Sequence, residues 1–265
     1  MAVIDLPIVA DNRDIAGFRP FKAMRHFRKL VADKEDTKQV FFIIEALKGR
    51  KVQEQAEAFL SSDTARNFMQ REEIVGLADM LDDHGRWADC GSDTVARRYI
   101  DFMSHEGLTA NGLVEESYDW RPREERPNDQ IEWYLCRLRD THDLFHVLTG
   151  YGRDALGEAA LLGFSYEQNH NLGVKFIAYA AARQIKKATR SSAPIYGAIK
   201  EGRALGKAAS TLAHMDVEKV MRSNIDEVRA RLNIGKPVLY RQCLAQLNSE
   251  GHAQEKLGLQ EPQAA

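Results

Sequence analysis

Cysteine is scarce in this 265-residue chain, and the few cysteines lie far apart. Cys90, Cys136 and Cys243 form no Cys-x-x-Cys pair, and their number is odd. Such a set provides neither a disulfide framework nor a zinc ribbon. We therefore expect reduced thiols in a cytoplasmic compartment. A chain of this length can bury a stable core without covalent or metal crosslinks.

Charge of one sign and long apolar runs are also missing. The 37 Lys and Arg residues nearly balance the 39 Asp and Glu residues, which argues against a nucleic-acid partner. No apolar run approaches the roughly 20 residues that span a bilayer. The first residues lack the basic start and apolar stretch of a secretory signal. We expect a cytoplasmic protein that is not secreted and at most rests on a membrane.

Apolar residues recur at helical spacing along most of the chain, and no segment alternates as a strand does. This pattern predicts an all-α fold with a single domain over residues 1–265, a core from about 20 to 235 and loosely ordered termini. The glycine- and proline-bearing segment 107–128 is expected to be an irregular connection. Helices are expected at about 21–31, 38–48, 52–60, 64–81, 93–105, 129–149, from 153 onward, 172–190, 194–214 and 217–232.

One of these apolar stripes contains histidine where leucine would be expected. The stripe repeats at intervals of four and three residues, and His142 lies within it. His146 follows one turn later on nearly the same side of the helix, and Asp143 projects about 100° from His142. Two imidazoles and a carboxylate therefore share a narrow arc at the edge of a buried face. The stripe consists of Ile131, Leu135, Leu138, His142, Phe145 and Thr149.

Burying such groups is costly unless something compensates them, and a divalent cation would do so. Glu158 is a further candidate ligand. On a straight helix it would lie about 24 Å from His142, so its participation requires the chain to reverse at Gly150-Tyr151-Gly152. The residues predict a metal site between two consecutive helices, with ligands His142, Asp143, His146 and Glu158.

A His-x-x-x-His pair alone is weak support for a metal, because satisfied core or surface histidines explain most such pairs. The adjacent aspartate, the apolar stripe and the glutamate after a turn favour the metal. Arg137 and Arg139, just before the motif, are the candidate catalytic residues. They could hold an anionic substrate or orient a ligand imidazole, and a solvated charged face is an equal alternative.

These residues resemble a known family. His142-Asp143-Leu144-Phe145-His146, eleven further residues and Glu158 match the HDxxH(x)11E motif of the Coq-four family of ubiquinone (coenzyme Q) biosynthesis. Tyr166-Glu167-Gln168 resembles its aromatic-Glu-Gln element, and similar segments extend the resemblance over about 21–234. Val95 and Asn171-Leu172-Gly173 depart from the family pattern, so we expect a divergent, bacterial member.

The resemblance implies a helical, metal-dependent carboxy-lyase. The implied reaction removes the C1 carboxylate of a polyprenylated 4-hydroxybenzoate, such as 4-hydroxy-3-methoxy-5-polyprenylbenzoate, with or without C1 hydroxylation. The implied metal is zinc, with Fe, Mn or Mg as alternatives. The resemblance also implies isoprenoid binding, a peripheral position on the inner membrane and contact with other ubiquinone-biosynthesis enzymes. We further expect a homodimer, because helical proteins with exposed apolar faces often pair symmetrically.

An isoprenoid tail would need an apolar tunnel between helices. Phe164, Phe176, Tyr179 and the small residues of 197–209 are candidates for its walls, although tight helix packing is the more ordinary explanation for small residues. A non-catalytic isoprenoid- or quinone-binding or scaffold protein would use the same metal motif. An HD-type phosphohydrolase is a third reading of His142-Asp143, disfavoured because that class does not place a histidine four residues after its pair.

Overall fold

The computed structural model of the protein describes residues 2–14, 17–33, 36 and 38–252. In this part of the chain the regular structure is helical, with one isolated bridge between Thr94 and Asn224 and no strand. The prediction of a single all-α domain is confirmed. The helices are α1 (Pro20–Ala32), α2 (Lys38–Ala46), α3 (Lys51–Leu60), α4 (Asp63–Ile74), α5 (Leu77–Asp82), α6 (Val95–Glu106), α7 (Ala110–Trp120), α8 (Gln130–Asp140), α9 (His142–Thr149), α10 (Ala155–Asn169), α11 (Leu172–Thr189), α12 (Ile195–Ala208), α13 (Val217–Arg222), α14 (Ile225–Arg231) and α15 (Val238–Ser249), with short 3-10 turns η1 (Val3–Asp5), η2 (His84–Trp87), η3 (Arg123–Glu125) and η4 (Leu212–His214).

Three of the predicted helices are each divided in two. The breaks fall at Gly76, at Thr141 and at Asn224, where the side-chain oxygen of Asn224 accepts hydrogen bonds from the amides of Asp226 and Glu227. Such a cap starts a new helix in a new direction even where the apolar spacing continues. Asp36-Thr37 is a suitable N-cap sequence for α2, but Thr37 lies outside the described residues.

The predicted irregular connection at 107–128 is wrong for half of its length, because α7 occupies Ala110–Trp120. Thr109 caps this helix by accepting a hydrogen bond from the Gly112 amide at 3.0 Å. The Asp82 carboxylate also accepts hydrogen bonds from the amides of Ala110 and Asn111. These two acceptors satisfy the first amides of α7, which offsets the low helix propensity of Gly112.

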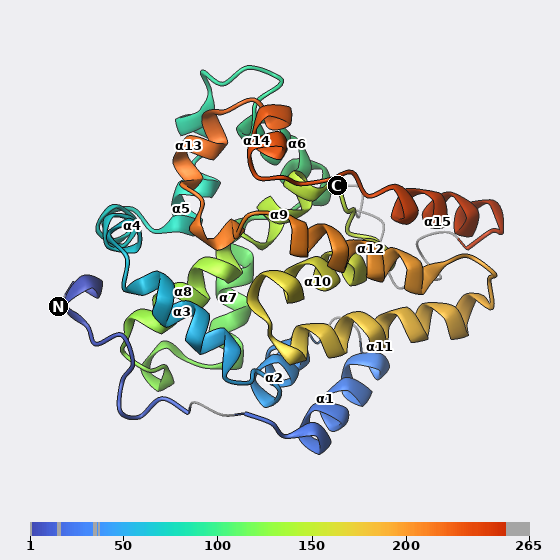
Figure 1. The fold of residues 1–265 in the computed structure, drawn as a ribbon, viewed down its shortest axis with the longest axis horizontal. Helices are drawn as coiled ribbons and strands as arrows, with labels where there is room; N and C mark the ends of the chain where they lie inside the picture. The colour runs from blue at the N-terminus through green and yellow to red at the C-terminus, as the bar shows by residue number, and fades with distance from the viewer. Residues whose placement is uncertain (1, 15–16, 34–35, 37, 253–265) are drawn as a thin grey trace.

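Helix α10 lies at the centre of the molecule and packs chiefly on α11 and α12 (Figure 1). The contact with α12 is close: a Cβ atom at Gly202 would lie 2.3 Å from the carbonyl oxygen of Ala160, and one at Gly206 would lie 2.4 Å from that of Phe164. Phe164 is fully buried in this core. The small residues of α12 therefore serve tight packing, and they do not line a tunnel together with Phe164.

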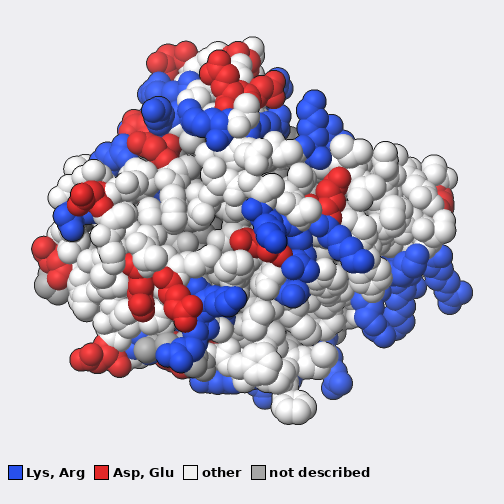
Figure 2. Space-filling model, in the orientation of Figure 1, with Lys and Arg blue, Asp and Glu red and all other residues white. Residues whose placement is uncertain are grey.

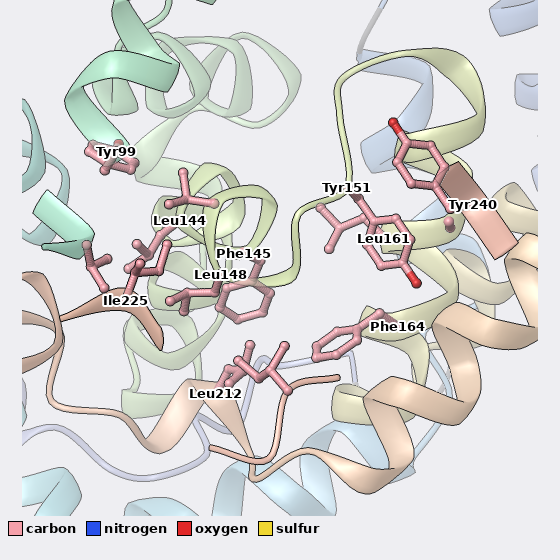
Figure 3. Packing of buried hydrophobic residues seen from close by; sticks show 14 of the residues in the cluster. Tyr99, Leu144, Phe145, Leu148, Tyr151, Leu161, Phe164, Leu212, Ile225 and Tyr240 are labelled. Atoms are coloured by element: carbon pink, nitrogen blue, oxygen red, sulfur yellow. The ribbon is translucent and has the colours of Figure 1, made fainter. Parts of the chain in front are cut away.

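The hydrophobic core extends beyond the bounds that we expected. Tyr240, Cys243 and Leu247 of α15 are buried in the main cluster, part of which is drawn in Figure 3. At the other end of the chain, the side-chain amide of Gln130 donates to the carbonyl of Leu6 at 2.8 Å, which ties the N-terminal segment to α8. Within the described residues, no helix is both long and apolar enough to cross a membrane.

Candidate metal centre

The two histidines of the motif lie one turn apart at the start of α9. The chain bends at Thr141, whose hydroxyl donates to the carbonyl of Arg137 at 2.8 Å, and α9 begins at His142. The imidazole rings of His142 and His146 are nearly perpendicular, with centroids 5.0 Å apart. The bend thus separates these histidines from α8, so the predicted stripe does not run along one continuous helix.

The chain reverses after α9, as the glycines predicted. Gly150 takes a left-handed conformation with φ of 77°, and its amide donates to the carbonyl of His146 at 2.8 Å. Asp154 then caps α10, whose first turn contains Glu158. The Glu158 carboxylate lies 3.7 Å from Nε2 of His142 and 3.4 Å from Nε2 of His146. The turn therefore brings Glu158 to the two imidazoles.

Asp143 completes the cluster. One potential ligand atom from each of His142, Asp143 and His146 lies within 4.8 Å of the others, and these three are the one such group that the described residues contain. Asp143 is buried in the fold and borders a cavity. The carboxylates of Asp143 and Glu158, together with the imidazoles, give the site more hydrogen-bond acceptors than donors.

The tautomer of His146 follows from its surroundings. Its Nδ1 lies 3.0 Å from the carbonyl oxygen of Tyr151. A carbonyl can only accept, so Nδ1 bears a hydrogen, and in the neutral imidazole Nε2 presents a lone pair. Nε2 is buried and has no hydrogen-bond partner among the described residues. A backbone carbonyl that fixes the tautomer from behind is the usual arrangement at a metal-binding histidine. The donor set therefore fits a divalent metal.

The charges of the cluster perturb each other strongly. Burial lowers the pKa of His142, but the carboxylates of Glu158 and Asp143 together outweigh burial and raise it overall. Burial by itself raises the pKa of Glu158. The imidazoles of His146 and His142 lower it by a larger amount, so the pKa lies well below its ordinary range. Glu158 is consequently ionised at neutral pH and available as a ligand.

Two apolar cavities meet at His142. The larger, about 640 Å³, extends from Asp143 and Glu158 toward α1 and α11. The smaller, about 300 Å³, lies toward α2, α7 and α8. Both are bordered by Val40, Phe41, Leu113, His142 and Leu162. Phe176 and Tyr179, which we expected in a tunnel, border a separate hollow of about 630 Å³ beside α1.

The two arginines of the motif have different surroundings. Arg137 is buried away from both cavities, where it ion-pairs with Glu72 and donates to the backbone carbonyls of Ala213, at 2.9 Å, and of Met215. Arg137 therefore does not border the cavities next to the candidate ligands, and its catalytic role stays a prediction. Arg139 borders the smaller cavity and donates to Asp140 and Ser117.

Arg153 and Phe102 also lie at the site, and the sequence spacing did not predict either of them. Arg153 borders the larger cavity, with Nε 3.5 Å from a Glu158 oxygen. The ring of Phe102 stacks on His146 with centroids 5.6 Å apart. Arg153 stands directly before the α10 cap, so its proximity to Glu158 could have been anticipated from the turn. Phe102 comes from α6, and only the tertiary structure places it here.

Comparison with known proteins identifies the family. A model of the family described as "Coenzyme Q (ubiquinone) biosynthesis protein Coq4" matches residues 29–238. The chain belongs to the Coq4 family. Its fungal relatives include proteins named ubiquinone biosynthesis protein COQ4, mitochondrial, from Ajellomyces capsulatus, 23% identical over 69% of this chain, and from Aspergillus flavus, 27% identical over 68%. The matched regions span 62% and 60% of those relatives' lengths.

A solved structure shares the fold. It is a crystal structure from Nostoc punctiforme, described as that of a candidate ubiquinone biosynthesis protein. It superposes with a TM-score of 0.59 and 16% sequence identity, covering 83% of this chain and all of that one. At this level of identity the likeness concerns the fold alone.

The placement of Arg137 generates a stability prediction. Arg137→Leu leaves Glu72 and two backbone carbonyls without their donor, so we expect the free energy of unfolding to fall by about 3 to 5 kcal/mol. Arg66→Leu removes an exposed ion pair with Asp63 and should cost less than about 1 kcal/mol. Urea denaturation of both variants measures the difference. Equal stability of the two would contradict a structural role for Arg137.

Proposed function

We propose that this protein holds a divalent metal, zinc in the first instance, on His142, Asp143, His146 and Glu158, and removes the C1 carboxylate of a polyprenylated 4-hydroxybenzoate. Family membership supports a role in ubiquinone biosynthesis. The observation that carries the metal is the buried Nε2 of His146, which has a lone pair in the neutral imidazole and no hydrogen bond among the described residues. Iron, manganese and magnesium are the alternatives to zinc.

The reaction is a decarboxylation in which atoms balance without an oxidant. The bond between C1 and the carboxylate breaks, CO₂ leaves, and C1 takes up a proton from water. A bound metal would act as a Lewis acid toward the substrate's oxygens. Arg153 lies at the cavity wall near Glu158, so its guanidinium can orient the anionic ring from the open side. Arg139 can contact the ring's oxygens only from the smaller cavity.

The cavities suit a substrate with an apolar tail. The larger cavity reaches the candidate ligands at one end and is bordered by Phe27, Leu30 and Ile177 at the other. A polar ring at His142 would therefore leave the tail among aliphatic and aromatic side chains, where burial stabilises it by about 25 cal/mol per Å². This arrangement matches the usual ligand site, an apolar hollow with few polar groups at one end.

A non-catalytic isoprenoid-binding or scaffold role is the second candidate. Two imidazoles and two carboxylates are enough to complete a four-coordinate sphere, and a closed sphere of that kind is typical of a structural metal. In that case the same cavities would bind an isoprenoid without turnover. Partnership with other ubiquinone-biosynthesis enzymes and a homodimer are compatible with either function, and both remain proposals.

Metal content is the first test. We expect about one metal ion per chain in the purified protein and its loss in His146→Gln and Glu158→Gln, because each variant removes a ligand. Elemental analysis by plasma mass spectrometry measures it. Glu116→Gln is the matched control, since Glu116 borders the same cavity but is not in the ligand cluster, and it should retain the ion. Metal absent from the parent protein, even after supplementation, would refute the site.

Turnover is the second test. The metal-loaded protein should release one CO₂ for each decarboxylated product from a prenylated 4-hydroxybenzoate, with no oxygen consumed, and Glu158→Gln should reduce release to background. Headspace CO₂ and dissolved oxygen are measured together. Consumption of one O₂ per turnover would replace our reaction with the oxidative version. Bound metal and bound lipid without CO₂ release would favour the non-catalytic candidate.

We also propose that the protein rests on an anionic membrane surface through α1 and α11. Neither helix contains an acidic residue, and the ring of Phe27 on α1 contacts that of Phe176 on α11. Phe18, two residues before α1, is 69% exposed, and Phe21, in the first turn of α1, is 92% exposed near the lysines and arginines of that helix. Figure 2 shows Lys and Arg side chains gathered at the C-terminal end of α11. Exposed aromatics flanked by cations suit a charged lipid surface.

Vesicle flotation measures this contact. The protein should float with vesicles containing phosphatidylglycerol and much less with neutral phosphatidylcholine, because each lysine or arginine near an anionic surface contributes about 1 kcal/mol. Phe21→Ser should weaken binding at least about tenfold through lost apolar burial. Tyr196→Ser, an exposed aromatic on α12, serves as control and should bind as the parent does. Equal flotation of both variants would exclude α1 as the contact.

A further inference from the structure

The turn that joins the two halves of the candidate metal centre is held by a residue from the C-terminal helix. Tyr240 of α15 donates its hydroxyl hydrogen to the Asp154 carboxylate and accepts a hydrogen bond from the amide of Gly152 at 3.0 Å. The rings of Tyr240 and Tyr151 lie edge to face, with centroids 5.2 Å apart. Figure 3 shows the two side chains next to each other. Both tyrosines are buried.

Asp154 transmits this contact to the ligand helix. Its second carboxylate oxygen accepts hydrogen bonds from the amides of Leu156, at 3.2 Å, and Gly157, at 3.0 Å. Its own carbonyl accepts from the Glu158 amide at 2.9 Å. The first turn of α10, which contains Glu158, is thus attached to the carboxylate that Tyr240 contacts. Loss of the tyrosine hydroxyl would leave that buried carboxylate with one donor fewer.

The same turn orients His146. The carbonyl of Tyr151 accepts the Nδ1 hydrogen of His146, and the next amide along the chain, that of Gly152, donates to Tyr240. The turn has no spare space, because a Cβ atom at Gly152 would lie 2.8 Å from the Tyr240 hydroxyl. A shift of the tyrosine would therefore move the peptide that fixes the histidine ring.

Tyr240 is itself anchored firmly. The Glu201 carboxylate of α12 accepts hydrogen bonds from the amides of Leu239, at 2.8 Å, and Tyr240, at 3.0 Å. Tyr240 lies beyond residues 29–238, the part of the chain that the family model matches.

We propose that Tyr240 is a positioning residue for the candidate metal centre, which it serves by holding the Gly150–Asp154 turn so that Nε2 of His146 and the Glu158 carboxylate converge on one point. The inference rests on the proposed metal site, but the hydrogen bonds of Tyr240 to Asp154 and Gly152 do not depend on a metal. Tyr240 touches neither metal nor substrate and acts through Asp154 and Gly152. Removal of such an outer partner typically weakens metal binding by about 10- to 100-fold.

The experiment compares Tyr240→Phe with Tyr134→Phe. Tyr134 is equally buried but lies in a different core cluster, so its variant makes the same chemical change away from the turn. In Tyr240→Phe we expect the amides of Gly152, Leu156 and Gly157 to exchange hydrogen at least about tenfold faster, measured by NMR without metal. We also expect the Kd for zinc to rise by about 10- to 100-fold, with the control unchanged in both.

Each outcome decides the inference. Unchanged amide exchange, or faster exchange with an unchanged zinc Kd, would overturn it. If the parent binds none of zinc, iron(II), manganese and magnesium, the metal proposal fails, and the exchange data alone decide whether Tyr240 holds the turn. If Tyr240→Phe does not fold, Glu201→Gln loosens the anchor of the tyrosine while keeping its side chain. That variant should show smaller changes in the same direction, and none would refute the role.

Discussion

Gly150 adopts a left-handed conformation at the end of α9, and the return of the chain along α10 depends on it. Because glycine lacks a Cβ atom, it adopts this conformation without the steric strain that other residues would incur. The amide of Gly150 closes α9 on the carbonyl of His146, and Asp154 opens α10 a few residues later. Without this reversal, two histidines and two carboxylates would be distributed along a rod instead of gathered at one place.

The gathered groups explain the character of the surrounding structure. Two acids and two imidazoles in one cluster cannot all be satisfied by one another, and Nε2 of His146 has no hydrogen bond within the described residues. Neighbouring apolar helices keep water from much of the cluster, whereas His142 and Glu158 face cavities. A cation at this position would satisfy the acceptors, and the cavities would bring an apolar substrate to the same point.

Much of the architecture was predictable because its causes are local. Apolar spacing predicted most helices, and the glycines at 150 and 152 predicted the reversal that the Glu158 assignment needed. The failures have equally specific causes. Capping by Thr109 created α7 where glycines suggested a loop, and Thr141 divided a continuous apolar stripe. Arg137 shares the motif's neighbourhood in sequence, but its hydrogen bonds join it to backbone carbonyls near residue 214.

The sequence by itself determined the all-α class and the spacing of the four candidate ligands, since helix periodicity and a glycine turn are properties of short segments. The tertiary structure alone decided which partners surround them. Phe102 from α6, the cavities toward α1 and α2, and Tyr240 from α15 reach the centre from segments distant in the chain. Contacts of that kind follow from how helices pack, and packing depends on the whole set of side chains at once.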